Sequence, residues 1–191
     1  YGSVSSEYGG LSALNTLVDA AHERGMSVIL DWVANHTAWD HPWISNADWY
    51  TQNSQGQIVH PPGTGWLDVA DLNYSNSAMR SAMISEMQYW VSEVGIDGFR
   101  ADAANFVPYD FWQQAIPAVR GATERPLLML AEGDRPDHHA AGFDLTFDWR
   151  FSNVVESVFN RSRPASWLQT EHQRIISQVP DGKSVLRFTT N

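Results

Sequence analysis

Three short, largely apolar runs in this chain each lead into an acidic residue. Asp31, Asp102 and Glu132 stand at the ends of these runs, which have the length and composition of buried strands. Moving a charged carboxylate out of water is costly, so isolated buried charges are rare. A chain that places several carboxylates at matching strand ends is therefore expected to build a site there.

The rest of the chain alternates between strand-like and helix-like segments, a pattern typical of a parallel α/β sheet. A closed (β/α)8 barrel needs eight strands and about 250 residues, and its active site lies at the carboxyl ends of the strands. Only five strands are apparent, which predicts either part of a barrel or a smaller open sheet. We expect strands near residues 27–30, 96–101, 127–131, 143–147 and 184–189, and helices near residues 11–21, 79–94, 109–119, 153–159 and 167–179.

Composition excludes several classes of function. The 191 residues suffice for one domain with a core, and 43% hydrophobic with 18% charged residues is typical of a globular protein. The net charge of -10 argues against nucleic acid and anionic membranes as partners. No apolar run is long enough to span a bilayer. Cysteine is absent, which excludes a disulfide framework and a thiol site.

Side chains alternate between the two faces of a strand, and this parity sorts the charged residues. Arg100 and Asp102 share one face of their strand, and Glu132 shares a face with the leucines two and four positions before it. Together with Asp31, these groups are expected to converge in one barrel mouth. Asp97 has the opposite parity and lies at the other end of its strand, so we expect a structural role for it.

Two carboxylates that flank a cleavable bond are what glycoside hydrolysis requires. One must be ionised, and the other must hold a proton for the leaving oxygen. Arg100 beside Asp102 favours the ionised form of that carboxyl, whereas apolar neighbours would raise the pKa of Glu132. The alternative is a structural Asp–Arg ion pair with an unrelated glutamate. For Asp31 we favour a structural role, in which it orients Arg100.

Nine tryptophans are a strong enrichment, and four of them fall in the polar, loop-like stretch from residue 37 to residue 70. They are expected either to form a small core under a long loop or to offer flat surfaces on which sugar rings stack. Both interpretations remain open at this point, and they can hold for different members of the set. The four are Trp39, Trp43, Trp49 and Trp66.

At these residues the chain resembles the α-amylase family of glycoside hydrolases. Four of the family's short motifs occur in order with suitable spacing, a fifth begins at the end of the chain, and together they span nearly all of it. The matching residues are Asp31, Asn35 and His36 for the first motif, Gly98, Arg100 and Asp102 for the second, Glu132 for the third, Val69–Asn73 for a further short motif, and Phe188–Asn191 for the start of the last.

The resemblance implies an α/β fold, a partial (β/α)8 TIM barrel with a small inserted loop domain. Residues 1–191 would form an incomplete catalytic barrel containing strands three to seven, and residues 37–74 the inserted loop subdomain. It further implies that Asp102 is the nucleophile, that Glu132 is the general acid/base and that Arg100 positions Asp102. Substrate contacts are expected at His36, Asp31, Asn105 and Asn191.

The activity implied is retaining hydrolysis of α-1,4-glucosidic bonds in starch-like glucans or maltooligosaccharides. Many α-amylases carry Lys-His at the position of Asn105-Phe106. The pair in this chain is more similar to that of α-glucosidases of the same family. The chain ends one residue before the His-Asp that continues the last motif, and that Asp is the family's third catalytic carboxylate. We therefore expect this 191-residue chain alone to be inactive, with the missing strands supplied by the rest of the native chain.

Many members of the family bind calcium between the inserted loop and the barrel. Asn35 and Asp71 match two of the usual ligand positions, whereas calcium takes six to eight oxygens, so Ca²⁺ is a candidate cofactor. No organic cofactor is expected. The resemblance alone favours a secreted or periplasmic location.

Three alternatives stay open at the level of sequence. The first is an α-glucosidase or transglycosylase of the same family. The second is a non-catalytic homologue that binds glycans or proteins, although such homologues usually lose the carboxylates that this chain keeps. The third is a metal-dependent hydrolase, which is disfavoured because the seven histidines include no HExxH or similar ligand spacing.

Overall fold

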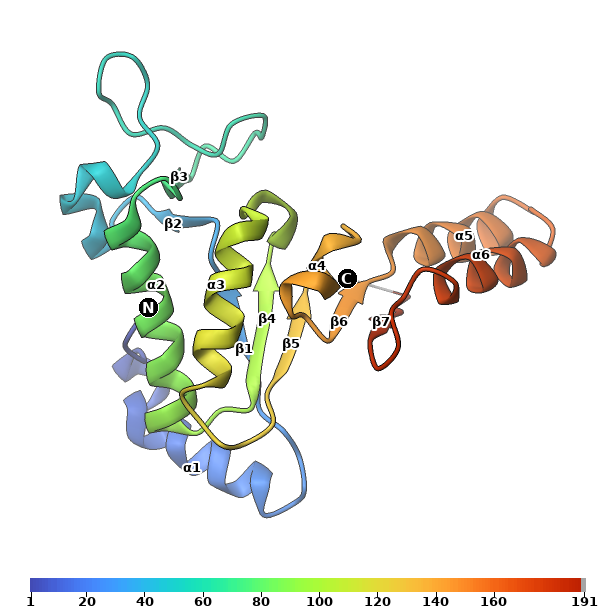
Figure 1. Cartoon of the computed structure of the whole chain (residues 1–191), viewed down its shortest axis with the longest axis horizontal. Helices are drawn as coiled ribbons and strands as arrows, with labels where there is room; N and C mark the ends of the chain where they lie inside the picture. Colours follow the sequence, from blue (N-terminus) through green and yellow to red (C-terminus); the bar gives the residue numbers. More distant parts are fainter. Residues whose placement is uncertain (190–191) are drawn as a thin grey trace.

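The computed structural model describes residues 1–189, and its centre is a five-stranded parallel sheet (Figure 1). The strands follow the order β1, β4, β5, β6, β7, so consecutive barrel strands lie side by side. Helices α2 and α3 cover one face of the sheet over β1, β4 and β5. The strands are β1 (Leu30–Val33), β4 (Gly98–Asp102), β5 (Leu128–Ala131), β6 (Leu145–Phe147) and β7 (Ser184–Leu186).

The helices alternate with these strands as the sequence predicts. They are α1 (Gly10–His22), α2 (Ser77–Tyr89), α3 (Tyr109–Arg120), α4 (Asp137–Ala141), α5 (Trp149–Asn160) and α6 (Ser166–Ile176). A π-helical turn (Trp90–Val94) extends α2, and short 3-10 turns occur at Ser6–Tyr8, Pro42–Ser45, Ala47–Trp49 and Ala104–Phe106. None of the helices in the described part of the chain is long and apolar enough to cross a membrane.

Helix α2 shows how the core is built from sequence. Asn76 caps the helix, because its side-chain oxygen accepts the backbone N–H groups of residues 78 and 79. Met79, Met83 and Met87 then follow at four-residue spacing, and all three are fully buried. Gly95 ends the π-helical turn in the left-handed conformation, which a residue without Cβ adopts without strain.

The faces of β4 confirm the parity argument. Phe99 and Ala101 are fully buried in the core, whereas Arg100 and Asp102 on the other face are half-buried. Gly98 begins the strand at φ +144°, and a Cβ at this position would lie 1.8 Å from the carbonyl oxygen of Leu128. Only glycine therefore allows β4 and β5 to approach each other at this point.

A long segment leaves the sheet between β1 and α2 and forms a small separate layer (Figure 1). Its two strands, β2 (His36–Ala38) and β3 (Val69–Asp71), pair antiparallel, with His36 opposite Asp71. Backbone hydrogen bonds from Thr51 to Asp71 and from Asp71 to Val59 fasten the intervening loop to β3. The segment thereby brings His36 and Asp71 to the carboxyl-terminal side of the barrel strands.

The α5–α6 pair extends away from the sheet on the side of β6 and β7 (Figure 1). Asp148 caps α5 by accepting the backbone N–H of Phe151, and its other oxygen accepts a hydrogen bond from Arg187. Glu171 in α6 is buried and pairs with Arg174 at 2.5 Å and with Arg150 at 3.0 Å. Hydrogen bonds and ion pairs therefore contribute to the packing of the α5–α6 pair.

Several predicted boundaries were wrong. The first strand begins at Leu30 instead of residue 27, because its ladder with β4 starts at Leu30 and Phe99; Asp31 consequently lies inside the strand. The last strand ends at Leu186 instead of residue 189, since its partner β6 is only three residues long. Helix α4 was not predicted, because five residues give no helical period.

Asp97 has the structural role that its parity predicts. Its carboxylate accepts the backbone N–H of Val28 at 2.7 Å and lies 2.8 Å from His22 Nε2, and Arg125 lies 3.4 Å from its second oxygen. These contacts join the amino-terminal ends of β1 and β4, away from the predicted site.

Candidate active site

One guanidinium group holds three carboxylates at the carboxyl ends of the strands. Arg100 Nη1 lies 2.5 Å from Asp31 Oδ1 and 3.2 Å from Asp102 Oδ1, and Nη2 lies 3.1 Å from Glu132 Oε1. The register explains this convergence, because Asp31 is paired with Arg100 across β1 and β4. The predicted contact between Asp31 and Arg100 is confirmed. The contact between Arg100 and Glu132 was not predicted.

Glu132 is fixed by backbone contacts as well. The N–H of Ala103, directly after Asp102, donates to Glu132 Oε2 at 2.9 Å, and the N–H of Ala104 donates to the Glu132 carbonyl oxygen at 3.1 Å. Ala103 adopts φ 47°, a left-handed conformation that residues other than glycine rarely adopt. Such local strain is typical of sites where the surrounding structure imposes one geometry. Here the turn after Asp102 is tied to Glu132.

The negative charges of Asp102 and Glu132 repel each other. Burial and the neighbouring charge of Glu132 raise the pKa of Asp102, and Arg100 only partly offsets them. Arg100 lowers the pKa of Asp102, as the sequence predicts, but the charge of Glu132, which that prediction left out, acts against it.

His36 is expected to be neutral near pH 7. Burial lowers its pKa, and the negative charges of Asp102, Asp71 and Asp68 oppose that shift without cancelling it. Asn35 Nδ2 lies 3.3 Å from His36 Nδ1, and because an amide nitrogen only donates, the ring proton belongs on Nε2. His36 can therefore donate a hydrogen bond from Nε2 without carrying a charge.

The four tryptophans of the inserted segment divide into two groups. Trp43 and Trp49 pack edge to face at 5.0 Å and lie against the hydrophobic core. Trp39 and Trp66 are exposed, and Trp66 stands between His36 at 5.5 Å and Phe106 at 5.2 Å. Two tryptophans thus pack against the core, and Trp66 with Phe106 forms an exposed aromatic wall beside His36.

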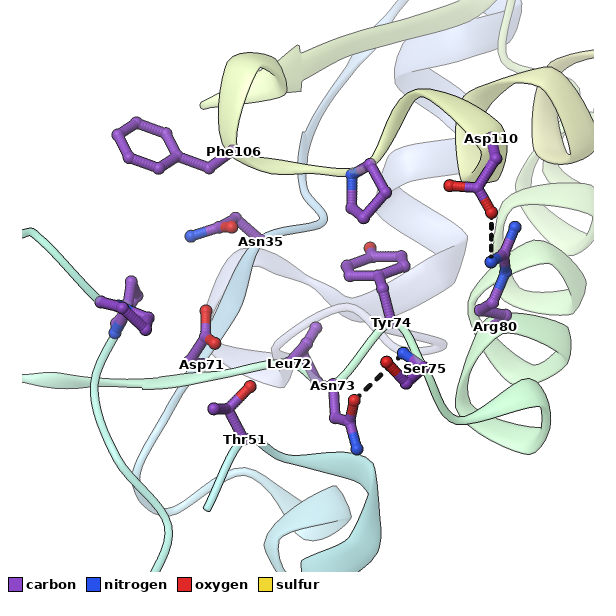
Figure 2. A pocket seen from close by; sticks show the side chains of 13 residues that line it. Asn35, Thr51, Asp71, Leu72, Asn73, Tyr74, Ser75, Arg80, Phe106 and Asp110 are labelled. Atoms are coloured by element: carbon purple, nitrogen blue, oxygen red, sulfur yellow. Dashed lines mark hydrogen bonds and ion pairs between the residues drawn. The ribbon is translucent and has the colours of Figure 1, made fainter. Parts of the chain in front are cut away.

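A cavity of about 520 Å³ lies between the inserted segment and the start of α3 (Figure 2). Asn35 and Asp71 line it on one side, and Arg80 pairs with Asp110 on the other at 2.7 Å. Burial raises the pKa of Asp71, and a hydrogen bond from Thr51 and the nearby charges of His36 and His60 counteract this. Neither Asp102 nor Glu132 lines this cavity, so it is separate from the paired acids.

The cavity meets only part of what calcium requires. Asn35 and Asp71 supply two side-chain oxygens, whereas calcium takes six to eight. Among residues 1–189, no group of three or more His, Asp or Glu side chains is placed to hold a metal ion. Backbone carbonyls and water would have to complete the coordination.

Comparison with known proteins decides the family. The sequence profile described as "Alpha amylase, catalytic domain" matches residues 1–66 and 63–140, which is well over half of the chain. The chain belongs to the α-amylase family. The alternating fold, the parallel strand order and the five strands are those of part of its (β/α)8 barrel.

Relatives in the α-amylase family differ in activity. An α-amylase of Haloarcula japonica is 30% identical over 158 residues, which is 76% of this chain and 23% of that protein. A trehalose synthase/amylase of Mycobacterium tuberculosis is 33% identical over 140 residues, which is 56% of this chain and 23% of that protein. The chain thus spans only a minor part of these curated relatives.

Solved α-amylase structures have the same fold. An α-amylase of Lactobacillus plantarum superposes with a TM-score of 0.91 at 29% identity, covering 100% of this chain and 48% of that one. A maltogenic α-amylase of Thermotoga neapolitana superposes with a TM-score of 0.85 at 30% identity, covering 94% of this chain and 42% of that one. In each case the chain corresponds to less than half of the solved structure.

Within this α-amylase barrel the structure brings together most of the predicted site residues. Asp31, Arg100, Asp102 and Glu132 form one cluster, and His36 lies close enough for the charge of Asp102 to act on it. The predicted contact at Asn191 lies outside the described residues.

Asn105 is placed differently from its predicted role in substrate binding. Its side-chain amide is bonded to two protein groups, with Nδ2 donating to Asp134 Oδ1 at 3.1 Å and Oδ1 lying 2.8 Å from His138 Nε2. His138 was missed at the level of sequence. The only signal was a pair of histidines after Pro136, in a segment too short for a pattern.

Proposed function

We propose that the protein carrying this chain is a retaining glycoside hydrolase that cleaves α-1,4-glucosidic bonds in starch-like glucans or maltooligosaccharides. The observation that carries the proposal is the binding of Asp102 and Glu132 to one guanidinium, on the same face of neighbouring strands. Retaining enzymes need two carboxyls about 5–5.5 Å apart, on either side of the glycosidic bond. We expect Asp102 and Glu132, which share one arginine, to have this spacing.

The reaction follows from the positions of these groups. A carboxylate oxygen of Asp102 attacks the anomeric carbon while the glycosidic C–O bond breaks, and Glu132 gives its proton to the leaving oxygen. The product of this step is a glycosyl ester on Asp102. Glu132, now ionised, takes a proton from water, whose oxygen attacks the anomeric carbon and releases the Asp102 carboxylate.

The charged groups around Asp102 and Glu132 each have a role in this mechanism. The reaction starts with Asp102 ionised and Glu132 protonated. Arg100 favours the ionised form of Asp102, whereas burial and the charge of an ionised Glu132 raise its pKa. Arg100 stabilises the single negative charge whichever oxygen carries it. We propose that His36, neutral and protonated on Nε2, donates a hydrogen bond to a sugar hydroxyl. Asp31 acts through Arg100, since its carboxylate makes the shortest contact with the guanidinium.

The stereochemistry of the first product tests this proposal. Maltoheptaose is incubated with the full native polypeptide, and the anomer released is followed by proton NMR before mutarotation. A retaining α-glucanase releases the α-anomer first. Release of the β-anomer would exclude Asp102 as nucleophile, and binding of maltoheptaose without turnover would favour the non-catalytic, glycan-binding alternative.

An α-glucosidase or transglycosylase is the second candidate, and the aromatic wall favours it. Phe106 is 52% exposed beside Trp66, and Trp66 lies 5.5 Å from His36, so an apolar surface on which a sugar acceptor would stack adjoins His36. An acceptor sugar stacked on this wall would compete with water for the glycosyl ester, which would favour transfer to a second sugar. Products of maltoheptaose separate the candidates, because an amylase makes internal cuts, a glucosidase releases glucose, and a transglycosylase forms longer chains.

Calcium binding at Asn35 and Asp71 is proposed as a stabilising feature of the same enzyme. Both side chains face the cavity between the inserted segment and the barrel (Figure 2). A cation there would link the two layers and offset the unfavourable burial of the Asp71 carboxylate. Isothermal titration with Ca²⁺ should show binding that Asp71→Asn removes, and no binding to the native protein would reject this site.

A further inference from the structure

Two loops that follow the paired acids are joined to each other by five hydrogen bonds. The first is the turn after Asp102, residues 103–106, and the second is residues 132–138, which begin at Glu132. Two of the five bonds are the backbone donations from residues 103 and 104 to Glu132 already described. Asn105 makes the other three.

Each hydrogen-bonding group of Asn105 other than its N–H is used in these contacts. Its Nδ2 donates to Asp134 Oδ1 at 3.1 Å, its Oδ1 lies 2.8 Å from His138 Nε2, and its carbonyl oxygen accepts from Arg135 Nη1 at 3.1 Å. Asn105 therefore spans the two loops.

His138 is the buried end of this connection, with 1% of its surface exposed. Burial and the charge of Arg135 lower its pKa to about 4, so the ring is neutral and uncharged near pH 7. The Asn105 amide oxygen can only accept, so His138 carries its proton on Nε2 and donates. The His138 ring also packs edge-on against Phe143, at 5.5 Å between centroids.

Gly133 shows that the loops are built for this close approach. A Cβ on Gly133 would lie 2.4 Å from Asn105 Oδ1 and 2.7 Å from His138 Nε2. Any side chain there would push apart the two atoms that form the bond. The residue directly after Glu132 therefore has to be glycine for Asn105 and His138 to meet.

We propose that Asn105 and His138 are positioning residues that fix the separation between Asp102 and Glu132. The inference rests on the proposed function, since it assigns the two acids to one reaction. The Asn105–His138 bond joins the turn that ends the Asp102 strand to the loop that starts at Glu132. Without it, the strained turn at Ala103 can relax, and the two carboxyls move relative to each other.

The test uses the full native polypeptide with maltoheptaose as substrate. Asn105→Ala and His138→Leu should each lower kcat by about 10²-fold with little change in KM, because displaced catalytic groups weaken the transition state more than substrate binding. His138→Gln should restore most of kcat, since its amide N–H can replace the donor. A higher KM with normal kcat in Asn105→Ala would instead show a sugar contact and overturn the proposal.

His139→Leu is the matched control. His139 lies in the same helix and is also buried, but its ring contacts the Phe143 carbonyl oxygen at 3.3 Å and Thr146 at 3.4 Å, away from Asn105. This variant should lose stability without the loss in kcat. An equal loss of kcat in His139→Leu and His138→Leu would mean that any damage to α4 is sufficient, and would reject the specific bond.

Ring nitrogen NMR separates failure of this inference from failure of the proposed function. The His138 Nε2–H signal should be present near pH 7 and should shift in Asn105→Ala. An active native enzyme with unaffected variants would overturn the positioning role alone. A native enzyme that does not turn over maltoheptaose would overturn the proposed function, and the catalytic part of this inference with it.

Discussion

Around β4 and β5 the molecule is dense and cross-linked, whereas the α5–α6 pair beyond β6 is open. Phe99, Ala101 and Met129 are fully buried, and five hydrogen bonds join the loops that follow these strands. No residue of α5 is buried, and Phe159 is 75% exposed. Polar contacts at Asp148 and Glu171 provide much of the order in α5–α6.

We therefore expect the region around β4 and β5 to determine catalysis, and the α5–α6 pair to affect mainly the stability of the fold. The paired acids stand on strands whose positions the core fixes, and α5 reaches Arg100 through Phe147, whose ring centroid lies 5.5 Å from Arg100 Cζ and 5.5 Å from the ring of Trp149. Substitutions at the strand ends of β4 and β5 should therefore change catalysis more than folding. Substitutions in α5–α6 should change folding more than catalysis.

The largest expected effect is the loss of activity in Asp102→Asn. Replacing the nucleophile should lower kcat by at least about 10⁴-fold. The melting temperature should stay constant or rise, because the substitution removes the repulsion between Asp102 and Glu132. Kinetics on soluble starch together with calorimetry test both expectations, and a clear fall in melting temperature would contradict the division drawn above.

The second effect concerns Arg100. Arg100→Ala should lower kcat by about 10²–10³-fold, because charge stabilisation and the position of the nucleophile are lost together. Arg100→Lys should rescue only part of it, since lysine lacks the planar fork that spans two carboxylates. The acidic limb of the pH–rate profile should move to higher pH, because Arg100 lowers the pKa of Asp102. An unchanged kcat would refute the assignment.

The third prediction compares this chain with a longer one. Purified residues 1–191 should hydrolyse starch far more slowly than a polypeptide that contains all eight strands of the barrel. In the described residues β1 and β7 each have one neighbouring strand, so the acids face an open barrel mouth. Specific activities on soluble starch, measured in parallel, check this, and equal values would show that the chemistry needs only these strands.

A smaller effect is expected in α6. Burial alone would raise the pKa of Glu171, but hydrogen bonds and charges from Arg174 and Arg150 lower it below its usual value. A lowered folded-state pKa contributes stability at neutral pH that is lost as the pH falls below about 4.5. Glu171→Gln should therefore be less stable than the native chain at pH 7. In acid the two should be equally stable, and kcat should stay near normal. Denaturant titrations at both pH values measure it.

His138 should also lose stability as the pH falls, in a higher pH window than Glu171. Burial and the charges of Arg135 and His139 lower its pKa to about 4, against the pull of Asp137 and Asp134. A histidine that is neutral when folded takes up a proton on unfolding, so stability falls as the pH drops from about 6.5 towards 4. His138→Gln should flatten the stability curve there. An identical slope in the variant would mean that His138 does not contribute.

Much of the fold could be predicted from sequence, for reasons that particular elements make clear. The methionines of α2 repeat at helical spacing, and Gly98, Arg100 and Asp102 lie on a strand whose parity fixes which side each residue faces. Boundaries were harder, because β1 and β7 end where their partners end, and that depends on residues far away in the sequence.

The candidate site was predicted in its residues but less well in its connections. Strand ends and parity brought Arg100 and Asp102 together, yet nothing in the sequence showed that Glu132 shares the same guanidinium. The roles of Asn105 and His138 depend on a contact across 33 positions, which no local pattern reveals. The division of the tryptophans into core and exposed wall likewise required the path of the loop.

The assignment of Asp102 as nucleophile is tested most directly by trapping the glycosyl ester. The full native polypeptide is treated with a fluorinated α-glucosyl fluoride, a substrate that forms the ester faster than water removes it, and the labelled peptide is identified by mass spectrometry. The structure predicts one sugar per chain, attached to Asp102 and absent from Asp102→Asn. A sugar attached to Glu132 or Asp31, or no ester on an enzyme that still hydrolyses maltoheptaose, would contradict it.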